Sequence, residues 1–290
     1  MKVFWKLLAY YAFTKFAGKQ ILYLNLDETS IPYTMKPLPG CVSLQDRRRR
    51  MKVKKQDVRG ALTYVSIICD SKDIQGHLPH YLIGSEAKIT KKFLRAQQAL
   101  PQTALRVLRR KSAWTTSADL VLILKELATV LKSWPALQPV LLLDAAPSHL
   151  PKSVMQTAKR CKIQLLFIPA ACTDKLQPLD LAAFSAFKGH LKRKQQVLRA
   201  GSVDGLIDPL AWVFDIMQCP RHFFAAKSWA RSFESVGASN PPRADRLHSE
   251  LQRFFGDVIV MPDGSKPSAA ELQSIWPERR RMAYAYRALL

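Results

Sequence analysis

Acidic residues, cysteines and long apolar runs are all scarce in this sequence. Of its 290 residues, 22 are Asp or Glu and 45 are Lys or Arg, so the formal net charge is +23 and a polyanionic partner is expected. The five cysteines are an odd number without paired spacing, which predicts reduced thiols in an intracellular protein and excludes a disulfide scaffold or zinc site. No apolar run approaches the roughly 18 residues of a membrane span; the run at 120–124 has five. We therefore expect no membrane partner.

The remaining composition is that of a globular protein. Hydrophobic residues make up 48% of the chain, which excludes overall disorder. The first 20 residues have a basic start and a short apolar stretch at 7–13, as a secretory signal does, but no small-residue cleavage site follows. We therefore predict an amphipathic leader helix over 1–20, a core over 21–200, and a helical extension with a basic tail over 201–290.

The order of apolar runs and helical patterns predicts an α/β fold. Three strands precede a basic, helical or irregular stretch at 88–114, and the later strands alternate with helices. We expect strands at 21–27, 61–70, 78–84, 140–144 and 163–169, and helices at 117–134, 151–162 and 176–198, the first of these capped by Thr116 or Ser117. The first three strands would form an antiparallel meander, so we predict a mixed sheet flanked by helices. Two helices and a hairpin at 258–267 are expected in the C-terminal extension.

Two of the few acids end apolar strands. Asp27 and Asp144 each follow a buried run, which would place both carboxylates at the carboxyl edge of the sheet, where α/β proteins form ligand sites. A turn or a helix cap is the alternative for either residue. Glu28 would point to the opposite face by strand alternation, so we do not count it as a ligand.

Asp180 lies near the start of the helix expected at 176–198. Helical spacing predicts that it shares the packing face of Phe184, Phe187 and Leu191, where a carboxylate needs a compensating partner. A capping or surface role is the alternative. Together with Asp27 and Asp144, Asp180 would suit two Mg²⁺ or Mn²⁺ ions about 4 Å apart in phosphoryl transfer.

Three segments then resemble a known family. NLDETSI (25–31), VLLLDAAPSHL (140–150) and FIPAACTDKLQPLDLAAFSAFK (167–188) closely resemble the catalytic blocks of DDE-superfamily transposases, in the pogo/Tigger/jerky branch related to mariner elements. Segments 114–127 and 228–237 also resemble the family. In the resemblance, Asp27, Asp144 and Asp180 occupy the three acidic positions.

The resemblance implies an RNase H-like core and a nuclear enzyme. It would use two divalent metals and no small-molecule cofactor to hydrolyse a phosphodiester at the element end and join the 3′-hydroxyl to target DNA. Terminal inverted repeats and target DNA are the implied partners, with a possible homodimer.

The sequence departs from the family at two points. Ala145 replaces the Asn that follows the second Asp, and only about 20 residues precede the core, where the family carries helix-turn-helix modules. These departures leave open a fragment, or a domesticated and catalytically silent nucleic-acid-binding or chromatin protein. A generic RNase H-like nuclease is a third hypothesis.

Several basic residues and one histidine complete the candidate site. A DNA-backbone contact, a solvated loop or a nuclear-localisation patch would each explain the basic run of Arg47, Arg48, Arg49, Arg50, Lys52, Lys54 and Lys55. Lys175 would contact phosphate or lie on the surface. His149 would approach the scissile phosphate, or cap or pack the loop that follows Asp144.

Overall fold

The structure is a computed structural model that describes residues 2–31, 62–98, 105–169, 172–201, 209–243, 268 and 270. Its centre is a six-stranded sheet in the order β4-β3-β2-β1-β5-β6. The hairpin expected at 258–267 and the basic run at 47–55 lie outside the described residues.

The central strand β1 (Gln20–Ile31) joins the two halves of the sheet. On one side it pairs antiparallel with β2 (Leu62–Cys69), which pairs antiparallel with β3 (His80–Ser85). On the other side it pairs parallel with β5 (Leu137–Leu143), which pairs parallel with β6 (Gln164–Phe167). The predicted fold class, an antiparallel group followed by parallel strands between helices, is confirmed.

The edge strand β4 (Leu105–Arg110) was not expected from the sequence. The helical or irregular stretch predicted over 88–114 instead contains helix α4 (Lys91–Gln98) and then β4, which pairs parallel with β3. The hydrophobic pattern did not indicate this strand, because three of its six residues are arginines and no apolar run is visible. Each arginine pairs with an acid elsewhere: Arg106 with Glu126, Arg109 with Glu86, and Arg110 with Asp119. Charged side chains on an edge strand also protect it from pairing with other chains.

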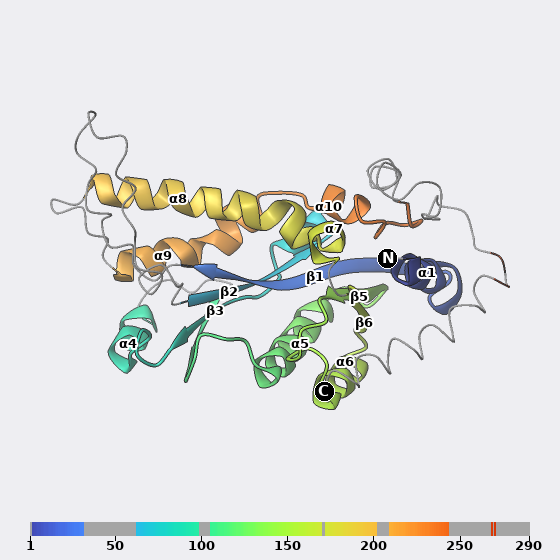
Figure 1. Ribbon diagram of the computed structural model, residues 1–290, viewed down its shortest axis with the longest axis horizontal. Helices are drawn as coiled ribbons and strands as arrows, with labels where there is room; N and C mark the ends of the chain where they lie inside the picture. The colour runs from blue at the N-terminus through green and yellow to red at the C-terminus, as the bar shows by residue number, and fades with distance from the viewer. Residues whose placement is uncertain are drawn as a thin grey trace, which may run out of the picture.

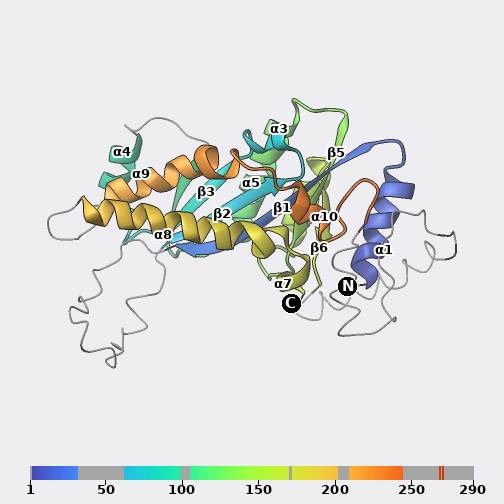
Figure 2. The same cartoon turned by 90° about the horizontal axis from the view of Figure 1, so that it is seen from above.

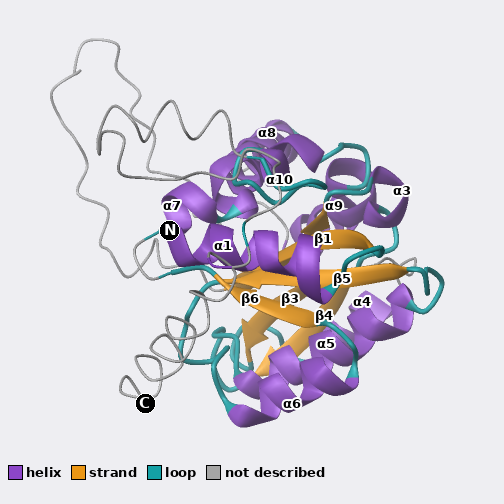
Figure 3. Ribbon diagram, turned by 90° about the vertical axis from the view of Figure 1, so that its right-hand side faces the viewer, coloured by secondary structure: helices purple, strands orange, loops and turns teal. Residues whose placement is uncertain are grey.

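Helices cover both faces of the sheet (Figures 1 and 3). The α8 face, as we call it, is covered by α1 (Lys2–Tyr10), α8 (Phe184–Ala200), α9 (Pro209–Cys219) and α10 (Ala230–Glu234). The opposite α5 face is covered by α5 (Ser117–Leu131) and α6 (Lys152–Arg160), and the short helix α3 (Lys72–Gln75) lies between β2 and β3 in the chain. Seen from above, α8 and α9 run side by side across the strands (Figure 2). In the described part of the chain, no helix is both long and apolar enough to span a membrane.

Strand alternation divides the hydrophobic core between the two faces. Odd-numbered residues of β1, such as Ile21 and Tyr23, pack on the α8 face, and even-numbered ones, such as Leu22 and Leu24, pack on the α5 face. The leader helix and the helices after residue 200 join the same α8-face core. The Trp5 indole, for example, donates to the Val236 carbonyl at 3.0 Å.

The helix predicted over 176–198 is divided into three segments. α7 (Thr173–Leu176) ends before Pro178, the π-helical turn η2 (Leu179–Ala183) follows, and α8 continues from Phe184. Proline cannot donate a backbone hydrogen bond, so a continuous helix would break there. Two further π-helical turns, η1 (Tyr11–Lys15) and η3 (Pro220–Phe224), extend α1 and α9.

Candidate active site

Asp27 and Asp144 come from neighbouring parallel strands. Asn25 is paired with Leu142 in the register of β1 and β5, so Asp27 and Asp144, each two residues further on, follow side by side. Alternation places both on the α8 face, because Tyr23 and Leu142 pack there. Asp27 is nearly buried, with 9% of its surface exposed. The prediction that Asp27 ends its strand is wrong, because β1 continues to Ile31 and Asp27 pairs with Ser66 of β2. The two acids are nevertheless adjacent, at the point where the pairing of β1 with β5 stops.

Asp180 lies in η2, which packs over the same face. The prediction that it shares a buried face with Phe184, Phe187 and Leu191 is wrong: those three side chains are buried, but Asp180 is exposed. A π-helical turn holds more residues than an α-helical turn, so α-helical spacing across residues 179–183 does not hold. Asp180 is therefore not a fully buried carboxylate on a packing face, as that prediction assumed.

The three carboxylates act on one another electrostatically. Burial, followed by the charges of Asp180, Glu28 and Asp144, raises the pKa of Asp27 to about 8, although the Glu28 backbone amide opposes this. Partial burial and the charges of Asp144 and Asp174 also raise the pKa of Asp180, and Lys188 opposes them. Asp27 is the member of the set that most needs a positive partner.

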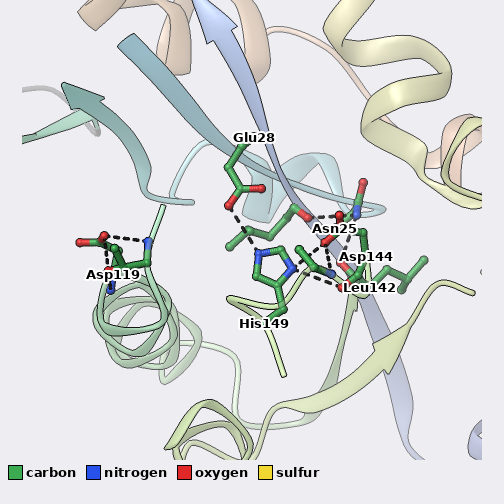
Figure 4. Close-up of polar contacts among 9 residues, drawn as sticks. Asn25, Glu28, Asp119, Leu142, Asp144 and His149 are labelled. Carbon is green, nitrogen blue, oxygen red and sulfur yellow. Dashed lines mark hydrogen bonds and ion pairs between the residues drawn. The ribbon is translucent and has the colours of Figure 1, made fainter. Parts of the chain in front are cut away.

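His149 already provides such a partner for Asp144. Its Nδ1 lies 2.6 Å from Asp144 Oδ1, and its ring is almost completely buried (Figure 4). Burial alone would lower the pKa of His149, but the carboxylates of Asp144 and Glu28 raise it to about 10. Burial alone would raise the pKa of Asp144, but His149 and the Ala146 amide, 3.3 Å away, bring it below its ordinary value. An imidazolium therefore holds the Asp144 carboxylate in its charged form.

Glu28 belongs to this cluster through His149. Its Oε1 lies 3.5 Å from His149 Nε2 without hydrogen-bond alignment, so the contact is an ion pair, and Figure 4 shows the imidazole between the two carboxylates. The sequence reasoning set Glu28 aside because it points away from Asp27. Two features of the sequence could have indicated the contact: Glu28 directly follows Asp27, and His149 lies five residues after Asp144.

The predicted nucleic-acid contacts are described only in part. Lys175 lies in α7, and its half-exposed ammonium is 3.9 Å from the Asp174 carboxylate. The seven basic residues between Arg47 and Lys55 lie outside the described part of the chain.

The donor chemistry of the site suits a hard divalent cation. Mg²⁺ and Mn²⁺ prefer carboxylate oxygens, and a cation would relieve the repulsion that raises the pKa of Asp27. Across the described residues, no group of three or more His, Cys, Asp or Glu side chains is arranged to hold an ion as it stands. The carboxylates would therefore have to draw together to share one.

Solved transposase structures have a similar but distant fold. The Mos1 transposase paired-end complex with the left transposon end is 17% identical, with a TM-score of 0.47 over 85% of this chain and 58% of that chain. The Mos1 mariner paired-end complex with Mn is 17% identical, with a TM-score of 0.49 over 87% and 61%. The Mos1 catalytic domain with Raltegravir and Mg is 15% identical, with a TM-score of 0.45 over 85% and 88%. Such distant likenesses carry no weight for the chemistry of the site.

The chain spans about three fifths of the length of the first two of these proteins. No curated protein matches it significantly. The family model described as DDE superfamily endonuclease matches residues 62–208, half of the chain. This range includes Asp144 and Asp180, and Asp27 precedes it. The resemblance to the DDE superfamily is thereby confirmed, whereas the pogo/Tigger/jerky branch stays a prediction, and the chain belongs to the DDE superfamily endonuclease family.

Proposed function

We propose that this chain is the catalytic domain of a transposase-type enzyme that cleaves DNA phosphodiesters with Mg²⁺ or Mn²⁺. The observation that carries the proposal is the grouping of Asp27 in β1, Asp144 directly after β5 and Asp180 in η2. Burial, followed by the charges of the neighbouring acids, raises the pKa of Asp27, the most buried of the three, to about 8. Grouping acids in a partly buried site costs folding free energy, because like charges repel one another and burial disfavours each charge. The binding of a cation as part of the function would explain why the protein keeps such a group.

Asp27, Asp144 and Asp180 would hold the metal, and two ions are proposed. When bound, the ions would activate water for attack on phosphorus and stabilise the departing oxygen. His149 keeps Asp144 ionised and oriented through the 2.6 Å contact of its Nδ1. Glu28 holds the imidazole in place through an ion pair with Nε2. Asp27 loses its proton more readily once a cation is near, because the repulsion that retains the proton is then offset.

DNA is the proposed substrate, and terminal inverted repeats and target DNA are the proposed partners. The net charge of +23 favours phosphate binding that weakens as salt rises. The basic run from Arg47 to Lys55, together with Lys175, is proposed to contact the backbone. On the family resemblance alone, we extend the proposal to strand transfer, to a homodimer and to the nucleus.

Metal-dependent nicking tests the cleavage proposal. The full chain would be incubated with terminal-repeat duplex and Mg²⁺ or Mn²⁺, alongside Asp144→Asn and the exposed surface control Asp73→Asn. We expect nicking by wild type and Asp73→Asn, and only background nicking by Asp144→Asn. Equal nicking by wild type and Asp144→Asn would remove Asp144 from the metal site.

Two observations favour a second function, that of a silent DNA-binding protein. His149 neutralises Asp144 without any metal, and Ala145 stands where the family has Asn. A silent protein would bind DNA with salt-dependent affinity but give no heat on titration with Mn²⁺, and the calorimetric titration therefore separates the two functions.

A further inference from the structure

A buried amide connects the three segments that bear the acids. Asn25 lies in β1, two residues before Asp27, and its side chain is completely buried. Its Nδ2 donates to the Leu142 carbonyl at 3.0 Å, two residues before Asp144. Its Oδ1 accepts from the Leu179 amide at 2.9 Å, one residue before Asp180. One side chain thus joins β1, β5 and η2 within two residues of each acid (Figure 4 shows Asn25, Leu142 and Asp144).

The contact with Leu179 replaces a missing helix cap. η2 begins after Pro178, which makes no side-chain cap, so the first amide of the turn has no partner from its own segment. Asn25 provides that partner from 154 residues away along the chain. The position of Asp180 therefore depends on a residue of the central strand.

Asparagine is well suited to this position because the site needs a donor and an acceptor at once. Leu142 offers a carbonyl and Leu179 an amide, and only one orientation of the Asn25 amide satisfies both. Aspartate would place a further acceptor against the Leu142 carbonyl, and leucine would fill the space but leave both backbone groups without this partner.

We propose that Asn25 is a positioning residue that sets the spacing of the Asp27, Asp144 and Asp180 segments for metal binding, an inference that rests on the proposed function. Repulsion between the three carboxylates opposes the close spacing that a shared metal ion needs, so the backbone segments that carry them must be fixed relative to one another. Asn25 holds that backbone and has no charge of its own. It acts through the metal-binding side chains, as outer residues do in other metal sites.

The test compares Asn25 with another buried amide of the same chain. Gln75 is also almost fully buried, accepts from the Cys69 amide at 2.9 Å and donates to the Ile67 carbonyl at 3.2 Å. Both of these bonds go to β2, which bears none of the three acids. Gln75→Leu therefore controls for the general cost of removing a buried amide.

Three quantities are measured for wild type, Asn25→Leu, Asn25→Ser and Gln75→Leu. They are the Mn²⁺ dissociation constant by calorimetry, the nicking rate against Mn²⁺ concentration, and the Tm in EDTA. We expect both Asn25 variants to raise the Mn²⁺ dissociation constant at least about tenfold. Gln75→Leu should lower the Tm but keep the wild-type constant. Asn25→Ser gives the answer if Asn25→Leu does not fold.

Several outcomes would overturn the inference. The inference is wrong if folded Asn25 variants bind Mn²⁺ as tightly as wild type. It is also wrong if Gln75→Leu loses as much Mn²⁺ affinity as the Asn25 variants lose. A wild-type chain that binds Mn²⁺ but does not nick DNA refutes the cleavage proposal alone, because the dissociation constants still decide the role of Asn25. A wild-type chain that binds no Mn²⁺ refutes both.

Discussion

Asp27→Asn should stabilise the metal-free protein, and the gain should grow with pH. Asparagine has the same size as aspartate and can keep the acceptor for the Glu28 amide, but it removes the charge that burial and the neighbouring acids disfavour. Active-site groups that oppose folding are a known source of stabilising substitutions.

The sign follows from proton linkage. The pKa of Asp27 is 3.8 in an unfolded chain and about 8 in the folded protein, so between these values the folded state binds more protons than the unfolded state. The free energy of unfolding of wild type therefore falls as pH rises from about 4 to about 8. Asp27→Asn lacks this loss.

The magnitude follows from the same two pKa values. One pKa unit corresponds to about 1.4 kcal/mol, so the full difference sets a ceiling of about 6 kcal/mol. Water penetration and local relaxation reduce the cost of a buried charge in real proteins, and we expect a gain of about 2 kcal/mol at pH 8 and much less at pH 5.

Urea denaturation in EDTA at pH 5 and pH 8, followed by circular dichroism, measures this gain. The exposed Asp73→Asn variant is the control and should change the free energy of unfolding little at either pH. Added Mn²⁺ should then stabilise wild type more than Asp27→Asn, because only a bound ligand adds to stability. An Asp27→Asn protein that is no more stable than wild type at pH 8, or whose gain is equal at both pH values, would refute the reasoning.

Three further predictions concern the scaffold and use the same urea assay. Gly84→Ala places a Cβ 2.5 Å from Ile89 Cδ1 in a buried part of the sheet and should cost about 2 kcal/mol; an unchanged midpoint would show that the core yields there. Thr116→Ala removes the N-cap of α5 and should cost about 1 kcal/mol, whereas Thr116→Ser should cost little. Burial raises the pKa of Asp70 to about 7, so wild type loses stability between pH 4 and 7; Asp70→Asn, which can still accept from the Tyr23 amide, should gain about 1 kcal/mol at pH 8 and nothing at pH 4.

The family assignment and the local geometry have different consequences for function. Membership of the DDE superfamily makes metal-dependent cleavage the leading hypothesis. The His149–Asp144 pair explains how the Asp144 carboxylate stays charged without a metal. The same pair lets a silent descendant keep its fold, because the imidazolium continues to neutralise Asp144. Metal binding and DNA binding therefore have to be measured separately.

Local sequence was sufficient for much of the fold. Apolar runs ending in Asp27 and Asp144 predicted two strands of the central sheet, and Thr116 before a helical pattern predicted the start of α5. Each of these signals lies within a window of about ten residues, where the spacing of apolar side chains reflects the element directly.

The tertiary structure decided the features that depend on contacts between residues far apart in the sequence. Strand β4 forms from an arginine-rich segment because acids on α5 and after β3 neutralise it. The exposure of Asp180 depends on the turn after Pro178, and the Glu28–His149 contact and the two bonds of Asn25 join residues more than a hundred positions apart. The sequence alone determined which acids this protein has and on which elements they lie. Only the packed chain determined how those acids face one another, because electrostatic coupling and amide bonding depend on distances that folding creates.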